Sequence, residues 1–219
     1  MKTIIIYSGG MDSTVLLYEL LAQGHKVAAL SIDYGQRHRR ELTAGQSVTA
    51  RLGVKHRIAD LSTLKPLLVG SSQTSKEIQV PQGKWTDESM KLTVVPNRNM
   101  LMLAVAGAWA ISRKADAIAY AAHAGDHAIY PDCREEFVKP LAEALMHADW
   151  HPVTIIRPFI GITKMDICAL GAKLGVPFAM TYSCYEGREV HCGKCGTCVE
   201  RKEAFALANV PDPTRYAYA

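Results

Sequence analysis

Strand-like and helix-like segments alternate along most of this chain, and this alternation restricts its possible folds more than any other feature. Residues 3–7 form a short run of β-branched and apolar residues, typical of a strand buried on both faces of a parallel sheet. Further strands are expected at 27–32, 56–59, 117–122 and 154–157, and helices at 12–22, 39–52, 100–113, 134–148, 163–174 and 199–208. This order predicts an α/β fold, a doubly wound and mostly parallel sheet with helices on both faces.

Length and composition indicate one compact unit. The chain has 219 residues, of which 48% are hydrophobic and 21% charged, an ordinary balance for a globular protein. At about 100–200 residues per domain, it corresponds to one domain or to one domain with a small appendage. We expect residues 1–180 to form the main domain and residues 181–219 a small C-terminal segment of the same unit. Residues 70–93 show no clear period and are expected to form a long loop, of a length that is usually either functional or mobile.

Several classes of protein are disfavoured by the sequence. No apolar run reaches the roughly 18 residues that a membrane span needs, and the first apolar run is too short for the core of a signal peptide. We therefore expect a cytoplasmic protein without membrane contact. The 25 Lys and Arg against 21 Asp and Glu leave a net charge of +4, which suits a phosphate-bearing ligand but gives little support for a stable nucleic-acid partner.

A turn with two adjacent glycines lies between the first predicted strand and the first predicted helix. Gly9 and Gly10 permit a tight turn and a close approach of a ligand to the backbone. The helix that follows offers unpaired N–H groups at its positive end, and Ser8, Ser13 and Thr14 add hydroxyl groups. The ordinary alternative is a capped strand-to-helix turn. The segment matches neither Walker A, because no lysine follows the glycines, nor the dinucleotide pattern G-x-G-x-x-G.

Two charged residues complete this candidate anion site. Asp12 would repel a phosphate unless a metal ion bridged the two, and it would otherwise serve as a helix cap. Lys164 lies in the first turn of the helix for which Thr163 is the expected N-cap. A cation there opposes the helix dipole, so a nearby anion would account for it. The alternative for Lys164 is a solvated surface lysine.

Four of the six cysteines crowd into a short stretch near the C-terminus. Their spacing is Cys184-x7-Cys192-x2-Cys195-x2-Cys198. Four thiolates so spaced can converge on one tetrahedral zinc ion in a closed, structural site. An iron–sulfur cluster, a redox C-x-x-C pair and inert buried thiols are the alternatives, and ligand number and spacing favour zinc. Cys133 and Cys168 stand apart, and Cys168 is expected in the core.

Two polar segments are candidates for contacts to a second substrate. Arg98 precedes the apolar helix at 100–113 and could bind a carboxylate or phosphate in a bidentate manner, unless it is a surface arginine beside a helix cap. The other segment follows the strand at 117–122. There, Asp126 or Asp132 could accept hydrogen bonds from the N–H groups of a guanine-like ring, and Tyr130 could stack on it or pack in the core.

The segment Ser8-Gly9-Gly10-x-Asp12-Ser13 resembles the pyrophosphate-binding loop of the adenine-nucleotide α-hydrolase-like ATP pyrophosphatases. This resemblance implies cleavage of ATP between its α and β phosphates, with an oxygen of the substrate becoming adenylated and Mg²⁺ accompanying the nucleotide. The residues that it implies in nucleotide binding are Tyr7, Ser8, Gly9, Gly10, Met11, Asp12, Ser13, Thr14, Asp33 and Lys164.

A narrower resemblance covers residues 1–204. The glycine turn, residues 33–38, 95–99 and 130–134 and the four cysteines are together similar to the 7-cyano-7-deazaguanine synthase family. The resemblance implies that ATP, 7-carboxy-7-deazaguanine and ammonia are the substrates, that one structural Zn²⁺ is bound per chain and that the protein is a homodimer. It also implies electrostatic roles for two residues and no side-chain nucleophile. The electrostatic residues are Asp12 and Lys164. From their placement at strand ends, and not from the resemblance, we expect Arg98, Asp126, Tyr130 and Asp132 to contact the deazaguanine.

Two other classes remain open. A tRNA-modifying thiolase would use the same adenylating loop on a nucleobase, but the net charge of +4 and the absence of a basic arm disfavour it. A zinc-ribbon binding module would use the cysteines alone and leave the glycine turn without a role.

Overall fold

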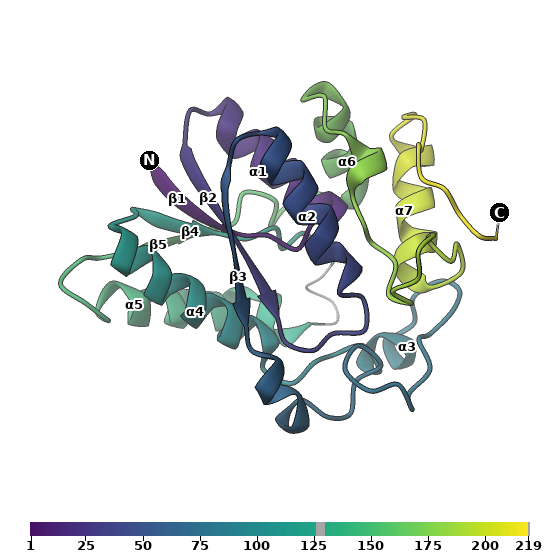
Figure 1. Cartoon of the computed structure of the whole chain (residues 1–219), viewed down its shortest axis with the longest axis horizontal. Helices are drawn as coiled ribbons and strands as arrows, with labels where there is room; N and C mark the ends of the chain where they lie inside the picture. The colour runs from purple at the N-terminus through teal and green to yellow at the C-terminus, as the bar shows by residue number, and fades with distance from the viewer. Residues whose placement is uncertain (126–129, 219) are drawn as a thin grey trace.

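Five parallel strands form the centre of the protein in a computed structural model that describes residues 1–125 and 130–218 (Figure 1). The strand order is β3-β2-β1-β4-β5. Register places Ile4 opposite Ala28 on one side and opposite Ile118 on the other. The strands are β1 (Lys2–Ile6), β2 (Lys26–Asp33), β3 (Lys55–Asp60), β4 (Ala117–Ala119) and β5 (Thr154–Ile156). The predicted doubly wound α/β fold is confirmed.

Helices cover both faces of this sheet. α4 and α5 pack on one face, while α1, α2 and α6 lie on the other and α7 packs beside α6 (Figure 1). The helices are α1 (Met11–Ala22), α2 (Arg40–Arg51), α3 (Asp87–Lys91), α4 (Arg98–Arg113), α5 (Glu135–Met146), α6 (Lys164–Lys173) and α7 (Gly196–Leu207). Three short 3₁₀ segments, η1 (Ser62–Leu67), η2 (Pro131–Cys133) and η3 (Phe178–Met180), join these elements.

Alternate residues of each central strand feed two separate cores. Ile4 and Ile118 point into the core under α4 and α5, whereas Ile5 and Ala119 point into the core under α1 and α6. Full burial of one such large aliphatic side chain contributes about 1.5–3 kcal/mol. Because both faces of the central strands are apolar, the helices of both layers pack against them. Cys168 lies fully buried in the second core, as expected.

Local capping decides where two helices begin. At α6 the N–H of Asp166 donates to Thr163 Oγ1 (3.2 Å) and the N–H of Thr163 donates to Asp166 Oδ2 (2.9 Å), which confirms Thr163 as the N-cap. The same kind of box at Thr86 and Ser89 starts α3. The expectation of an unbroken loop over residues 70–93 is therefore wrong in part, because a helix of five residues is too short to show a period.

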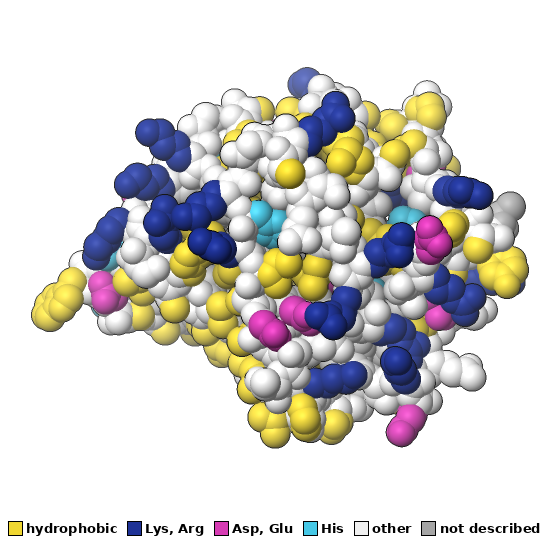
Figure 2. All heavy atoms as spheres, viewed as in Figure 1, with side chains coloured by type: hydrophobic (Ala, Val, Ile, Leu, Met, Phe, Trp, Pro, Cys, Tyr) yellow, Lys and Arg dark blue, Asp and Glu magenta, His cyan; other side chains and the backbone are white. Residues whose placement is uncertain are grey.

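The surface is largely polar in the view of Figure 1, and Lys and Arg are more widespread there than Asp and Glu (Figure 2). The edge strand β3 exposes Lys55 and Arg57, and charges on an edge strand disfavour pairing with another chain. No helix within the described residues is both long enough and apolar enough to cross a membrane. The boundary proposed near residue 180 stays a prediction.

Candidate active site

A cavity of about 420 Å³ opens beyond the carboxyl ends of β1, β2 and β4. β1 lies between β2 and β4, so this is the point at which the strand order reverses, where ligands of doubly wound folds bind. α1, α4, α6 and the segment around the four cysteines complete its walls. The cavity is therefore the candidate active site.

The glycine turn forms one end of this cavity. Gly9 has a φ of +83°, and a Cβ placed on it would lie 2.2 Å from the carbonyl oxygen of Glu41 and 2.6 Å from the backbone nitrogen of Gly45. Only glycine fits there without moving α2. Gly10 is the N-cap of α1 and supplies no side chain to the free N–H groups of the first turn. The turn therefore presents backbone donors and a helix dipole to an anion.

Two hydroxyl groups stand beside these donors. Ser8 Oγ and Ser13 Oγ lie 3.0 Å apart, and the N–H of Gly10 donates to Ser8 Oγ (3.1 Å). Both serines line the cavity, together with Gly10, Met11 and Asp12. The turn is thus already shaped to surround a small anion.

A lysine between two carboxylates lies next to the turn. Lys164 Nζ is 3.2 Å from Asp12 Oδ2 and 2.8 Å from Glu200 Oε2. Burial has the largest single effect and would raise the pKa of Asp12, but Lys164, His123 and Arg201 together outweigh it and hold that pKa below the ordinary value. Asp12 Oδ1 is buried and accepts no hydrogen bond within the described residues. We call Ser8, Asp12, Ser13, Lys164 and Glu200 the turn site.

The remaining residues of the predicted nucleotide set lie behind the cavity wall. The side chains of Tyr7 and Thr14 are fully buried, and their hydroxyl groups lie 3.1 Å apart. Asp33 forms an ion pair with Arg39 and accepts from the N–H of Gly35 (3.0 Å). Tyr7, Gly9, Thr14 and Asp33 do not line the cavity, so these residues support its wall from behind. Whether any of them contacts a nucleotide stays a prediction.

The predicted substrate residues separate into three groups. Arg98 and Tyr130 line the cavity, and the hydroxyl of Tyr130 lies 2.9 Å from Thr93 Oγ1. Nε of Arg98 is buried and donates to no acceptor in the described part of the chain. Asp132 does not line the cavity, since its Oδ2 accepts from the N–H of Asn99 (3.3 Å) at the start of α4. Asp126 lies outside the described residues.

A further set of cavity residues received no individual role from the sequence, although two of them lie in the segment 33–38 that it marked. The polar and aromatic members that line the cavity after β2 and near the cysteines are Tyr34, His38, Glu41, Trp85 and Tyr185, which we call the aromatic site. Trp85 comes from residues 70–93, so the functional alternative for this segment agrees with its position. Its ring packs on the start of α7, because a Cβ on Gly196 would meet it at 2.4 Å. Glu200 was also missed, since no local motif marks it.

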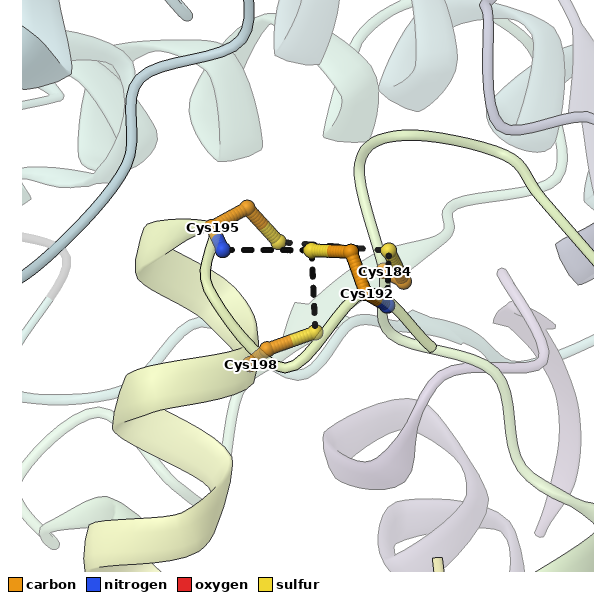
Figure 3. A group of neighbouring side chains, drawn as sticks. All are labelled: Cys184, Cys192, Cys195 and Cys198. Atoms are coloured by element: carbon orange, nitrogen blue, oxygen red, sulfur yellow. Dashed lines mark hydrogen bonds between the residues drawn. The ribbon is translucent and has the colours of Figure 1, made fainter. Parts of the chain in front are cut away.

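The four clustered cysteines converge as their spacing predicted. All four are buried, and their sulfur atoms lie within 4.8 Å of one another (Figure 3). Sγ–Sγ distances are 3.9 Å for Cys192 and Cys198 and 4.0 Å for Cys184 and Cys195. Backbone N–H groups of residues 192 and 195 donate to Cys184 Sγ and Cys192 Sγ at 3.3 and 3.2 Å, which favours thiolates. This donor set fits a tetrahedral, sulfur-binding metal ion.

The metal centre and the cavity share a helix. Cys195 is the N-cap of α7, and Cys198 lies in its first turn (Figure 3). Thr197 and Glu200, also on α7, line the cavity, and Glu200 reaches Lys164. The arrangement of the four cysteines therefore fixes the start of α7 and, with it, one wall of the cavity.

An all-parallel sheet, a glycine turn that leads into an uncapped helix and a cavity at the switch point define a class of protein: an α/β enzyme with the architecture of the ATP pyrophosphatases. Comparison with known proteins narrows that class. Residues 2–209 match the family described as queuosine biosynthesis protein QueC. The chain belongs to the QueC family.

Curated relatives align with this chain over almost its whole length. The 7-cyano-7-deazaguanine synthase of Pseudoalteromonas translucida (strain TAC 125) is 48% identical over 215 residues, which cover 98% of each chain. The enzyme of the same name from Brucella ovis is 49% identical over 218 residues, covering 99% of this chain and 94% of the relative.

Solved structures share the fold at low identity. The U34-tRNA thiolase NcsA from Methanococcus maripaludis, solved with its [4Fe-4S] cluster, has a TM-score of 0.53 and 21% identity, covering 95% of this chain and 65% of that one. The NMN synthetase from Francisella tularensis has a TM-score of 0.52 and 15% identity, covering 96% and 78%. These likenesses concern the fold alone.

Proposed function

We propose that this chain is an ATP-dependent carbon–nitrogen ligase that converts 7-carboxy-7-deazaguanine and ammonia into 7-cyano-7-deazaguanine. Membership of the QueC family and relatives with 48–49% identity support this reaction. The observation that carries the proposal in this chain is the turn site, where Lys164 and open helix N–H groups face the cavity beside Gly10.

The chemistry explains why such a site is needed. A carboxylate is a poor electrophile, so its oxygen attacks the α phosphorus of ATP, and pyrophosphate leaves. Ammonia then displaces AMP from the acyl adenylate, loses a proton and leaves the amide. The amide oxygen attacks a second ATP, a second pyrophosphate leaves, and loss of AMP and a proton gives the nitrile. Each round thus expels one pyrophosphate, which the enzyme must bind.

The turn site provides the groups for this anion. The backbone of Gly9 and Gly10 and the hydroxyl groups of Ser8 and Ser13 would hold the pyrophosphate, and Lys164 would offset its charge. Catalysis then consists of positioning and electrostatic stabilisation, without a side-chain nucleophile.

Mg²⁺ fits the same place. The unpartnered, buried Oδ1 of Asp12 is an oxygen ligand of the kind that Mg²⁺ accepts in combination with phosphates. Bound there, Mg²⁺ would neutralise charge on the phosphates. Asp12 would thereby be compatible with an anion that it would otherwise repel.

Arg98 is our candidate for binding the acid substrate. Its Nε is buried without an acceptor, and its guanidinium lies beside the phenol groups of Tyr34, Tyr130 and Tyr185. A carboxylate is the natural partner for an arginine with a spare donor. Asp132 is a weaker candidate than the sequence suggested, because it holds the first turn of α4 instead.

Zn²⁺ is our candidate for the four-cysteine centre. The ligands would be Cys184, Cys192, Cys195 and Cys198. With four protein ligands, no coordination position is left for a substrate, so the ion would be structural. It would fix the start of α7 and through it Glu200.

The proposed assembly is a cytoplasmic homodimer that acts on small molecules without a stable nucleic-acid partner. The modest net charge of +4 supports the last point. Light scattering of the purified protein, alone and with tRNA, tests the oligomer and the partner together.

The test of the reaction is to incubate the metal-loaded protein with ATP, ammonium and 7-carboxy-7-deazaguanine. Mass spectrometry should find the nitrile, and nucleotide analysis should find AMP and pyrophosphate. Formation of ADP and phosphate, or the absence of any deazaguanine product, would contradict the proposal.

A further inference from the structure

One carboxylate in the cavity lacks the cation that the others have. In the described part of the cavity wall the carboxylates are Asp12, Glu41 and Glu200. Asp12 and Glu200 both bind Lys164. Glu41 forms no ion pair with Lys or Arg in the described residues, although its side chain is only 13% exposed.

The neighbours of Glu41 leave much of its hydrogen-bonding capacity unused. Its Oε1 accepts from Gln36 Nε2 (3.1 Å) and lies 3.5 Å from His38 Nε2. No group in residues 1–125 or 130–218 donates a hydrogen bond to its Oε2. Burial, together with the charge of Arg98, lowers the pKa of His38 to about 3, so the imidazole is neutral at pH 7 and does not compensate Glu41.

A second polar atom beside Glu41 is also unsatisfied. Nδ1 of His38 is buried and has no hydrogen-bond partner among the described residues. Buried polar atoms are normally paired, and His38 lines the cavity, so an unpaired atom on its ring is consistent with a partner that a ligand supplies. Glu41 and His38 together therefore mark a polar binding position within the aromatic site.

The surroundings of this position suit a flat ring. The rings of His38 and Tyr185 have centroids 5.2 Å apart, and those of Trp85 and Tyr185 are 6.1 Å apart. All three line the cavity, as does Tyr34. Aromatic side chains that gather around a cavity favour planar, conjugated ligands, which stack on their faces.

The pattern of hydrogen-bond donors and acceptors on the ligand edge then decides which planar ligand can pair with Glu41. The six-membered ring of a guanine-type base presents two adjacent donors, its ring N–H and its exocyclic 2-amino group. Adenine presents one donor beside an acceptor nitrogen. An ionised carboxylate offers two acceptors side by side and no donor, so it matches the guanine-type edge and not the adenine edge.

We propose that Glu41 is a specificity-determining residue that binds the 2-amino and ring N–H edge of the deazaguanine substrate. This inference rests on the proposed function and adds a residue to it. The position differs from the earlier candidates, since Asp132 is engaged with Asn99 and Asp126 lies outside the described residues.

The state of the free enzyme agrees with this role. Burial raises the pKa of Glu41 to about 8, and Gln36 and Arg98 only partly oppose that effect. Near neutral pH the free enzyme therefore keeps Glu41 largely protonated, and the two donors of a bound base would favour its ionised form, which accepts from both. A base without the 2-amino group would leave an acceptor unpaired, and sites of this type discriminate strongly against such analogues.

The test compares two acids in the wild type and in Glu41→Gln. One acid is 7-carboxy-7-deazaguanine, and the other is its analogue without the 2-amino group. The isosteric glutamine replaces one acceptor by a donor that faces the donors of the base. We expect KM for the amino-bearing acid to rise about 10- to 100-fold, since a bidentate pair discriminates by about 1–3 kcal/mol. KM for ATP should not change.

The decisive measurement is the preference of each enzyme for the acid with the 2-amino group over the analogue without it. The wild type should prefer the amino-bearing acid about 10- to 100-fold, and Glu41→Gln should lose that preference. Glu143→Gln, which removes the same charge from an exposed position on α5, is the matched control and should behave as wild type. Equal losses on both acids would mean that Glu41 is structural. A raised KM for ATP instead would mean that it faces adenine.

Calorimetry can measure the binding of each acid to the enzyme without ATP. This measurement tests the role of Glu41 independently of the proposed reaction. If the wild type binds the amino-bearing acid selectively but forms no nitrile, the proposed function fails and the role of Glu41 stands. If the wild type binds both acids equally, the role of Glu41 is overturned, even where the variant does not fold.

Discussion

The turn site and the aromatic site of the cavity differ in whether their buried carboxylates are paired with a cation. At the turn site Lys164 pairs with two carboxylates, and its charge holds the pKa of Asp12 low. In the aromatic site Glu41 has no ion pair with Lys or Arg among the described residues, and burial raises its pKa to about 8. The first arrangement pairs its charges before a ligand arrives, whereas we propose that a ligand completes the second. On this proposal the turn site would provide electrostatic stabilisation and the aromatic site selectivity.

Metal removal should produce the largest effect, because the four-cysteine centre fixes α7 and with it one member of the turn site. Chelation, or Cys195→Ser, should destabilise the protein by about 5 kcal/mol or more, which lowers Tm by roughly 10–20 °C for a chain of this length. Thermal unfolding measures the change in Tm, and elemental analysis measures the metal content of the same sample. Cys168→Ala, outside the cluster, should keep its metal. An unchanged Tm after complete metal loss would rule out a structural ion.

Elemental analysis also identifies the metal. One zinc per chain and no visible absorption are expected. A brown protein that contains iron and labile sulfide would instead assign the centre to an iron–sulfur cluster.

Lys164→Met is expected to have the next largest effect. It removes the cation that faces the departing pyrophosphate, and loss of one such group costs about 10²–10³ in kcat. Single-turnover measurement of AMP formation tests this. Lys173→Met, in the last turn of the same helix, should retain wild-type rates. Wild-type kcat in Lys164→Met would remove this lysine from the mechanism.

The pH dependence of stability tests the aromatic site. The pKa of Glu41 rises from 4.5 to about 8 on folding through burial, with Asp33 adding to the rise and Gln36 and Arg98 opposing it. Between these values the unfolded chain has released a proton that the folded chain retains, so stability falls as pH rises. The pKa of His38 falls from 6.5 to about 3 on folding, and its opposite contribution to stability is common to wild type and variant, so it cancels from the difference between them.

We therefore expect Glu41→Gln to gain about 3–4 kcal/mol in unfolding free energy relative to wild type between pH 5 and pH 8. Urea unfolding at several pH values measures the difference. A difference that does not vary with pH would mean that Glu41 has an ordinary pKa and that the contrast between the two sites is wrong.

Ser13→Ala should have the smallest effect. It removes one hydroxyl from the turn site and leaves the backbone donors, so kcat/KM for ATP should fall about tenfold, or by about 1.4 kcal/mol. Ser47→Ala, an exposed serine on α2, is the control. Identical kinetics for Ser13→Ala and wild type would show that the backbone alone binds the phosphates.

The same contrast explains what could be foreseen from the sequence. The glycine turn and the four cysteines are contiguous patterns whose geometry follows from local spacing, and both form as predicted. Thr163 as the N-cap of α6 is equally local. Alternating apolar segments were enough to define the sheet, because strands and helices of this length have clear periods.

Contacts between distant segments could not be foreseen. Glu200 reaches Lys164 across 36 positions, and no pattern near either residue marks the pair. Glu41 lies in the first turn of an amphipathic helix, where an acidic residue ordinarily complements the helix dipole. Its burial arises only when α4 and the segments that carry Trp85 and Tyr185 pack around it. Asp132 looked equally suitable from sequence, but tertiary structure gives it a capping partner.

Gly9 has a consequence for how the cavity can change. It touches α2 backbone to backbone, at the carbonyl of the residue whose carboxylate we assign to the base. At this contact no side chain stands between the glycine turn and α2 to absorb a displacement. If the turn binds phosphate and α2 the base, as we propose, the separation of the two substrates would be fixed by the main chain, and transplanting the turn into another scaffold would preserve its chemistry only if α2 were transplanted with it.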